Sequence, residues 1–354
     1  MSIADEQRVS ASGPTTAQSA SQPGAYSPQA IRKLNGLTSD FYAREATSFS
    51  ATRQAPWHGW EKAWELITAP DAAQGPFPSH AAVRDSLSSR AARIPDDYAS
   101  NSKDSLAVLD LGCGNLRFER FLAERANAPL RVTALDNCPD LASPEIGALS
   151  AAFPHSLRSS SAASKTKEEN ASGQGANPPE KTIVDLRALD IVESLLDSTF
   201  ADRLPCNSHD LAVAFGLMHH LPTFALRVRV LEGLLGALRP GGFAIVSFWQ
   251  FLNDPRLAAK AATVTAEGHA AHFLPTFHEN DFLLGWQHAE GVYRFCHHTP
   301  ENEIDALLAA IREPSAPSTS GCASAAPPSF REVARFSADG KLGNLNRYLI
   351  LQHL

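Results

Sequence analysis

The chain has 354 residues, of which 44% are hydrophobic and 19% charged, and its formal net charge is −7. This composition excludes a wholly disordered, collagen-like or coiled-coil protein, and no apolar run approaches the ~18 residues of a membrane span. The start, MSIADEQRVSASGPTT, lacks the apolar stretch of a secretory signal. Because a negative chain offers no general attraction to nucleic acid, we expect neither DNA nor a membrane as a partner.

Three segments are rich in Ser, Ala, Gly and Pro and poor in large apolar side chains: residues 1–28, 156–181 and 314–329. Such segments bury too little apolar surface to offset the entropy of ordering. We predict a disordered tail over 1–28, a helical extension over 29–100, and a main domain over 101–354 that carries the other two segments as disordered insertions.

Apolar periodicity gives the elements in chain order. Strand-like runs are expected at residues 106–110, 131–136, 209–215 and 243–249, and helical spacing at 115–125 and 226–238. Continuous apolar strands joined by helices predict a parallel sheet covered on both faces. The chain ends in two further runs on either side of a glycine-containing turn, which predict a closing antiparallel hairpin.

The turn after the first strand, in VLDLGCGN, carries the most information. Gly112 and Gly114 let the backbone approach a ligand closely at the carboxyl edge of the sheet. Asp136 ends the next strand, where a carboxylate can accept hydrogen bonds from both hydroxyls of a ribose. Arg117 replaces the third glycine of the dinucleotide pattern, and Asp110 would repel a pyrophosphate but attract a cationic amino-acid tail. These features favour S-adenosylmethionine (SAM), which has such a tail and no phosphate.

The segments LDLGCGN, ALDN, HDLAVAFGLMHHL and LRPGGFAIVSFW follow one another within about residues 104–350. In this order the chain resembles the class I SAM-dependent methyltransferases. The resemblance implies an α/β, Rossmann-like fold with a seven-stranded, mostly parallel sheet, a C-terminal antiparallel hairpin and helices on both faces. It implies SAM as the cofactor of a methyltransferase domain, and on this basis we predict contacts at Asp110, Gly112, Cys113, Gly114, Asp136, Asn137, Asp190, Ile191 and Phe215.

Residues 41–60 read FYAREATSFSATRQAPWHGW, and HHLP and VSFWQF follow later. Together these resemble the tRNA wobble-uridine carboxymethyl methyltransferases, which convert the carboxylate of 5-carboxymethyluridine to its methyl ester. The resemblance implies a tRNA substrate, a role of the 29–100 extension as a substrate cap, and a small activator subunit. Such a subunit would add a strand at an exposed sheet edge near Asp136.

A carboxylate acceptor is already ionised at neutral pH, so its methylation needs positioning and desolvation rather than a general base. An arginine can hold one carboxylate oxygen while the other attacks. We predict Arg53 and His219 as catalytic residues. The predicted substrate-binding residues are Tyr42, Trp57, His220 and Trp249. The competing interpretation is a solvated arginine on a helix face and a histidine pair that only packs.

Two other functions remain open from the sequence. One is a small-molecule O- or N-methyltransferase, and the other is a catalytically silent SAM-binding module that acts on a partner. The five cysteines stand at positions 113, 138, 206, 296 and 322 without a CxxC pair, so we expect free thiols in a reducing cytoplasm. Adjacent histidines such as His297 and His298 rarely bind the same ion, so we predict no metal site.

Overall fold

The computed structural model describes residues 26–68, 105–126, 128–142, 157–159, 182–272, 274–287, 289–313 and 329–354. The expected tail, except its last three residues, and most of the two expected insertions lie outside these ranges. Within them, every helix is too short or too polar to span a lipid bilayer.

The main sheet has the spatial order β3-β4-β2-β1-β5-β6-β10-β9. Its strands are β1 (Leu106–Leu111), β2 (Leu130–Asp136), β3 (Leu157–Ser159), β4 (Ile183–Ala188), β5 (His209–Ala214), β6 (Leu238–Trp249), β9 (Phe330–Ala338) and β10 (Asn346–His353). Pairing is parallel from β3 to β6, and β10 is antiparallel to both β6 and β9. The predicted seven-stranded, mostly parallel sheet with a terminal hairpin is therefore confirmed.

The described residues add one strand to this prediction. The three residues of β3, which lie within the segment 156–181 that was expected to be disordered, pair with β4. β2 lies between β1 and β4 rather than at an edge. The edge next to Asp136 that an activator subunit would join is thus already paired, because β4 covers it from Arg131 to Asp136.

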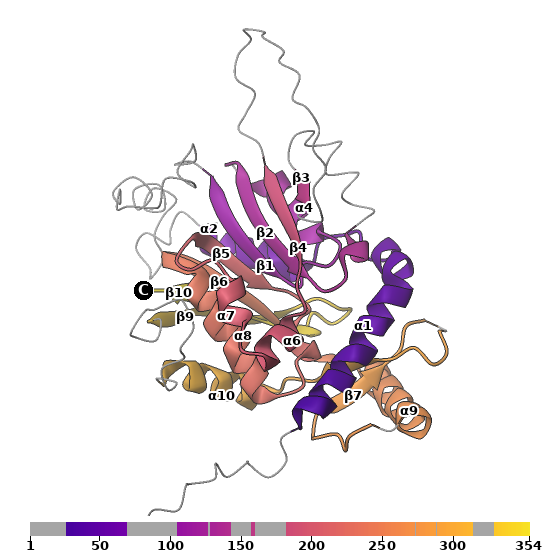
Figure 1. The fold of residues 1–354 in the computed structure, drawn as a ribbon. Helices are drawn as coiled ribbons and strands as arrows, with labels where there is room; N and C mark the ends of the chain where they lie inside the picture. The colour runs from indigo at the N-terminus through magenta and orange to yellow at the C-terminus, as the bar shows by residue number, and fades with distance from the viewer. Residues whose placement is uncertain are drawn as a thin grey trace, which may run out of the picture.

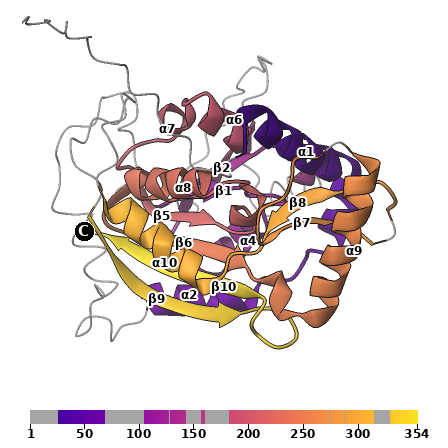
Figure 2. The same ribbon diagram turned by 90° about the horizontal axis from the view of Figure 1, so that it is seen from below.

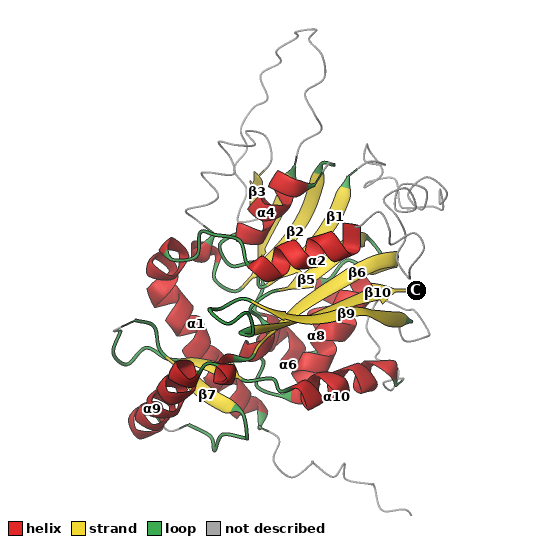
Figure 3. Cartoon of the chain, turned by 180° about the vertical axis from the view of Figure 1, so that it is seen from behind, coloured by secondary structure: helices red, strands yellow, loops and turns green. Residues whose placement is uncertain are grey.

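The helices are α1 (Pro28–Ala51), α2 (His58–Thr68), α4 (Arg117–Arg125), α6 (Ile191–Leu196), α7 (Phe200–Arg203), α8 (Phe224–Ala237), α9 (Pro255–Ala271) and α10 (Glu301–Arg312), with short 3-10 turns η2 (Pro139–Leu141), η3 (Met218–His220) and η4 (Phe251–Asn253). Figures 1 and 3 show the sheet between two helical layers, with α6, α8 and α10 on one side and α2 and α4 on the other. Strand alternation explains the two cores. One core lies on each face of the sheet. Leu109 packs into one of them and its neighbour Val108 into the other, because successive side chains of a strand point to opposite faces.

The extension before β1 is helical in its described part, residues 26–68. Ser27 caps α1 by accepting from the Ala30 N–H, and Pro28 occupies the first turn, where its missing N–H costs nothing. Ile31, Leu34 and Phe41 are buried at helical spacing. Figure 2 shows α1 crossing beside α6 and the β7–β8 region, where it bounds the carboxyl end of the sheet.

A small second sheet was not expected from the sequence. β7 (Asp281–Leu284) and β8 (Arg294–His297) pair antiparallel, and α9 packs against them (Figure 2). β8 also contacts α1 and η3. This places Arg294 at the site described below.

The structure differs from the sequence-based predictions in two details. β6 starts directly after α8, with a register irregularity opposite 209–211, so the RPGG segment begins the strand rather than preceding it. The prediction of free thiols holds for Cys113, Cys138 and Cys296, but it is wrong for Cys206, which is disulfide-bonded. Sequence spacing could not reveal this bond, because a disulfide needs two Cα atoms within about 7 Å and the fold sets that distance.

Candidate active site

A cavity of about 750 Å³ lies at the carboxyl edge of the parallel strands. Strand register explains why, since Asp110 stands opposite Ala134 of β2 and Val213 of β5, which brings three strand ends level. Every residue predicted from the sequence lines this one cavity: Tyr42, Arg53, Trp57, Asp110, Gly112, Cys113, Gly114, Asp136, Asn137, Asp190, Ile191, Phe215, His219, His220 and Trp249. Their assigned roles remain predictions.

The glycine turn forms the floor of one half of the cavity, which we call the cofactor half. Gly112 and Gly114 have φ of +75° and +56°, a region that side chains disfavour. The Gly114 N–H donates to Asp136 Oδ2 at 2.8 Å, and the Cys138 N–H donates to Asp136 Oδ1 at 2.7 Å. Burial raises the pKa of Asp136 and these two bonds oppose that rise. The carboxylate is held in place and retains lone pairs for a diol.

Asp110 is paired with an acid that sequence reasoning missed. Asp110 and Glu119 of α4 are 2% and 1% exposed, and Asp110 Oδ1 and both Glu119 carboxyl oxygens lack a protein donor. Burial raises the pKa of Asp110 well above its usual range, and Glu119 adds to that rise; burial also raises the pKa of Glu119 to about 7. Both raised pKa values favour protonated carboxyls in the protein without ligand, and a cationic group at Asp110 would favour their ionised forms. The available signal was an acid on an apolar helix face, between Phe118 and Phe121.

Asp190 forms the far wall of the cofactor half. Its carboxylate caps α6 by accepting from the Glu193 N–H at 2.9 Å. It also accepts from Asn35 Nδ2 at 2.9 Å and from Asn137 Nδ2 at 3.3 Å. These bonds tie α1 to the sheet edge, so Asp190 positions this wall as well as lining it.

The other half of the cavity, the acceptor half, contains two arginines. Arg53 lies after α1, with its guanidinium carbon 4.3 Å from the Phe49 ring centre and 4.7 Å from that of Trp286. Its Nη1 donates to Thr52 Oγ1 at 2.9 Å. Burial, and then the charge of Arg294, lower the pKa of Arg53 to about 10. An anion bound here would stabilise the charged guanidinium and raise its pKa again.

Arg294 of β8 was missed by the sequence analysis. It is 5% exposed and lies among the rings of Phe41, Tyr42 and Trp249, at 4.7 to 5.9 Å. Its Nη1 is 3.4 Å from Tyr42 Oη, and its Nε has no partner. Within the described ranges neither Arg294 nor Arg53 has a carboxylate partner. A buried cation without a counter-ion is costly, so this pair marks an anion site.

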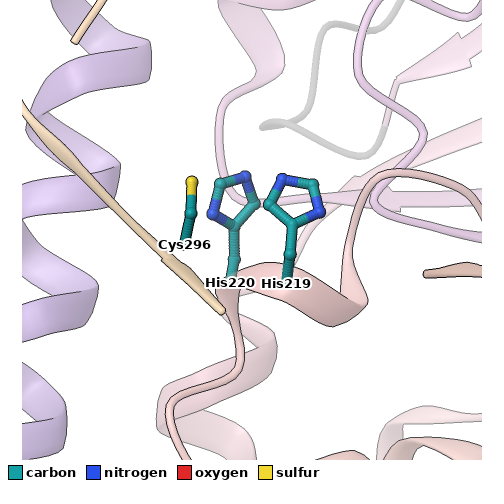
Figure 4. A group of neighbouring side chains, drawn as sticks. All are labelled: His219, His220 and Cys296. Atoms are coloured by element: carbon teal, nitrogen blue, oxygen red, sulfur yellow. The ribbon is translucent and has the colours of Figure 1, made fainter. Parts of the chain in front are cut away.

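Figure 4 shows the His219 and His220 rings side by side, with Cys296 of β8 next to them. His220 Nδ1–H donates to the Phe295 carbonyl at 2.8 Å, so its Nε2 accepts from Tyr42 Oη at 2.9 Å. Burial lowers the pKa of His220 to about 3 and that of His219 well below its usual value, which leaves both rings neutral. His219 Nδ1 has no protein partner.

The ligand atoms of His219, His220 and Cys296 lie within 4.8 Å of one another, a spacing suited to a metal. The surroundings disfavour one. Both nitrogens of His220 are engaged, and the Arg294 charge lowers the pKa of both imidazoles. A divalent cation would meet the same repulsion, so we describe these residues as a wall of the acceptor half.

Aromatic side chains complete that half in different ways. Tyr42 makes T-shaped contacts with the rings of His220 and Phe49. Trp57 lies so close to Gly216 that a Cβ there would stand 3.6 Å from its ring. Trp249 packs against His219 at 4.9 Å between ring centres. All three rings therefore line the cavity while packing against other side chains of the protein.

No family model matches this sequence, and a search of curated proteins finds no match. Solved structures do match. One is a SAM-dependent methyltransferase from Methanosarcina mazei, 17% identical, covering 74% of this chain and 98% of that chain with a TM-score of 0.43. Another is a SAM-dependent methyltransferase from Clostridium acetobutylicum, 9% identical, covering 70% and 83%, with a TM-score of 0.38. A third is the 1,6-didemethyltoxoflavin-N1-methyltransferase of Burkholderia thailandensis with bound S-adenosylhomocysteine, 15% identical, covering 84% and 92%, with a TM-score of 0.39.

The mostly parallel sheet with its terminal antiparallel pair is the Rossmann-like fold of the class I methyltransferases, as predicted. Similarity at this level carries no argument about activity.

Proposed function

We propose that the protein is a SAM-dependent methyltransferase whose acceptor is a carboxylate. The cofactor half suits SAM in three respects. Asp136 would bind a ribose diol beside two glycines of positive φ, Asp110 has an unpartnered oxygen for an ammonium, and Asp190 would border the adenine. The surplus of acid in this half matches a cationic ligand.

The single observation that carries the carboxylate acceptor is the arginine pair without counter-ions. Arg53 and Arg294 line the same cavity as the cofactor half, and both are largely buried. A guanidinium presents a planar pair of donors that fits a carboxylate. An ammonium substrate, by contrast, would be repelled by two cations.

When bound, SAM supplies an electrophilic methyl group, and its transfer to a carboxylate oxygen leaves a methyl ester and S-adenosylhomocysteine. The roles of the protein are to hold one carboxylate oxygen with Arg53 and Arg294, to exclude water with Trp57 and Trp249, and to keep His219 neutral. No proton has to move. Sulfonium and carboxylate charges cancel in the transfer, and a cavity of low dielectric favours that cancellation.

For the substrate class we propose a carboxymethyl group on a tRNA wobble uridine. The similarity of residues 41–60 to the enzymes of that reaction supports it, and the same segment contributes Tyr42, Arg53 and Trp57 to the cavity. A second candidate is a small-molecule O- or N-methyltransferase, which the unpartnered Nδ1 of His219 would suit as a base.

The test is mass spectrometry of total tRNA nucleosides from a strain that lacks the gene. We expect the methyl ester of 5-carboxymethyluridine to disappear and the free acid to accumulate. The wild-type gene and an Arg44→Ala variant should restore the ester, because Arg44 is exposed on α1 and outside the cavity, whereas Arg53→Ala should not. An unchanged nucleoside profile would contradict the tRNA substrate and favour the small-molecule function.

A further inference from the structure

The segment 52–57, between α1 and α2, carries Arg53 and Trp57 into the cavity. The backbone carbonyls of three consecutive residues in it are bound by side chains. Asn115 Nδ2 donates to the Arg53 carbonyl at 3.0 Å, Arg120 Nη2 to that of Gln54 at 2.6 Å, and Arg117 Nη1 to that of Ala55 at 3.0 Å. We call these three donors, Asn115, Arg117 and Arg120, the carbonyl clamp.

All three donors come from the few residues that follow the glycine turn. Between two of them, Leu116 is fully buried and has a φ of +56°, a left-handed conformation that a non-glycine residue adopts only when its surroundings impose it. The Arg117 guanidinium also lies over the rings of Trp57 and Trp60, at 5.2 and 4.9 Å. The clamp is thus built on a backbone that packing holds in one conformation.

The clamp connects the two halves of the cavity directly. On one side, the Gly114 N–H of the same turn bonds to Asp136, the predicted ribose ligand. On the other side, the clamp binds the backbone carbonyl of Arg53, whose side chain lines the acceptor half. The glycine turn and segment 52–57 are therefore joined without any intervening element.

We propose that the carbonyl clamp couples cofactor binding to acceptor binding, so that SAM in the cofactor half orders segment 52–57 and sets Arg53 for the carboxylate. Asn115, Arg117 and Arg120 are positioning residues in this scheme, which rests on the proposed function for the identity of both ligands. Because coupling between two binding sites is reciprocal, the acceptor should also strengthen SAM binding.

The experiment is amide hydrogen exchange, followed by mass spectrometry, with and without S-adenosylhomocysteine. In the wild type we expect this ligand to slow exchange both in the glycine turn and in a peptide that covers 52–57. In Arg120→Ala the ligand should slow exchange in 52–57 roughly 2- to 10-fold less than it does in the wild type, which is the effect of one hydrogen bond. Its affinity for the ligand should change less than about threefold, since Arg120 does not line the cavity.

Three further variants make the result specific. Arg120→Lys keeps a donor and should recover part of the slowing. Arg125→Ala is the matched control, because Arg125 lies on the same helix but pairs with Glu61 rather than with a carbonyl of 52–57. Asn115→Asp replaces the amide donor with an acceptor at constant size and should weaken the slowing independently of Arg120.

Equal slowing of 52–57 in the wild type, Arg120→Ala and Asn115→Asp would overturn the coupling. Slowing of the glycine turn alone in the wild type would overturn it as well, while leaving the proposed cofactor intact. If the ligand slowed exchange nowhere and calorimetry showed no binding, the proposed function itself would fail, and the coupling with it.

Discussion

The two halves of the cavity are built in opposite ways. The cofactor half consists of a glycine turn and carboxyl groups at strand ends, and its ligands come from short, continuous segments. The acceptor half consists of arginines among aromatic rings, collected from α1, the 52–57 segment, η3, β6 and β8. One half thus accumulates negative charge and the other positive charge within one cavity. This polarity matches a cationic donor and an anionic acceptor that neutralise each other when they react.

The largest effect should follow from removing the acceptor charge. We expect Arg294→Ala to lower turnover about 100-fold or more, because truncation leaves a buried carboxylate without its partner. Binding of S-adenosylhomocysteine should stay within about threefold of the wild type, since the two halves are separate sites. Steady-state kinetics and calorimetry measure the two quantities.

Arg294→Lys keeps the charge without the planar fork and should fall between the wild type and Arg294→Ala. Loss of cofactor binding by Arg294→Ala, with an unchanged melting temperature, would contradict the division into halves.

The reverse effect is expected for Asp136→Ala. The substitution removes the carboxylate that would accept two hydrogen bonds from the ribose hydroxyls, so the affinity for S-adenosylhomocysteine should fall roughly 30- to 100-fold. The affinity for the acceptor, measured at saturating SAM, should change little. Asp140→Ala is the matched control, because Asp140 is exposed in the adjacent turn η2 and does not line the cavity. Equal loss in both variants would remove Asp136 from the cofactor site.

A smaller effect should follow from His219→Ala. Since a carboxylate acceptor needs no base, turnover should fall less than about tenfold, whereas removal of a true general base costs about 10²- to 10⁴-fold. The wild-type rate should also be flat over about pH 6–8, because burial keeps the His219 pKa well below this range. A fall of 100-fold or more would favour a protonated acceptor, such as an amine or hydroxyl, over a carboxylate.

The smallest effect concerns stability. Burial raises the pKa of Glu119 to about 7 from its usual 4.5, so the folded protein without ligand holds a proton that the unfolded chain releases. The stability of the wild type should therefore fall as the pH rises from about 4.5 to about 7 and then level off. Glu119→Gln cannot ionise at this position, so its pH trend should be shallower than that of the wild type, with only the Asp110 contribution left. Each kcal/mol of this difference corresponds to about 2–4 °C in melting temperature.

Thermal melts at pH 5, 6, 7 and 8 give the difference between Glu119→Gln and the wild type. A difference that stays constant across this series would contradict the raised pKa of Glu119. S-adenosylhomocysteine, with its ammonium at Asp110, should flatten the trend in the wild type.

Much of the cofactor half could be predicted from the sequence. Asp110, Gly112 and Gly114 are near neighbours in the chain, and Asp136 ends the next strand, so local apolar periodicity was enough to place them at one edge. The acceptor half was predicted in part. Arg53, Trp57 and His219 line the cavity as expected, but their partners there come from segments with no local signal.

The sequence by itself determined the strand and helix pattern, and therefore the edge at which a ligand can bind, because side-chain periodicity and glycine turns act over a few residues. The tertiary structure alone decided the charge environment of that edge. It placed Arg294 next to Arg53, Glu119 against Asp110, and the carbonyl clamp on segment 52–57. Burial and proximity between distant segments set the cost of a charge, and neither quantity is encoded in the spacing of residues along the chain.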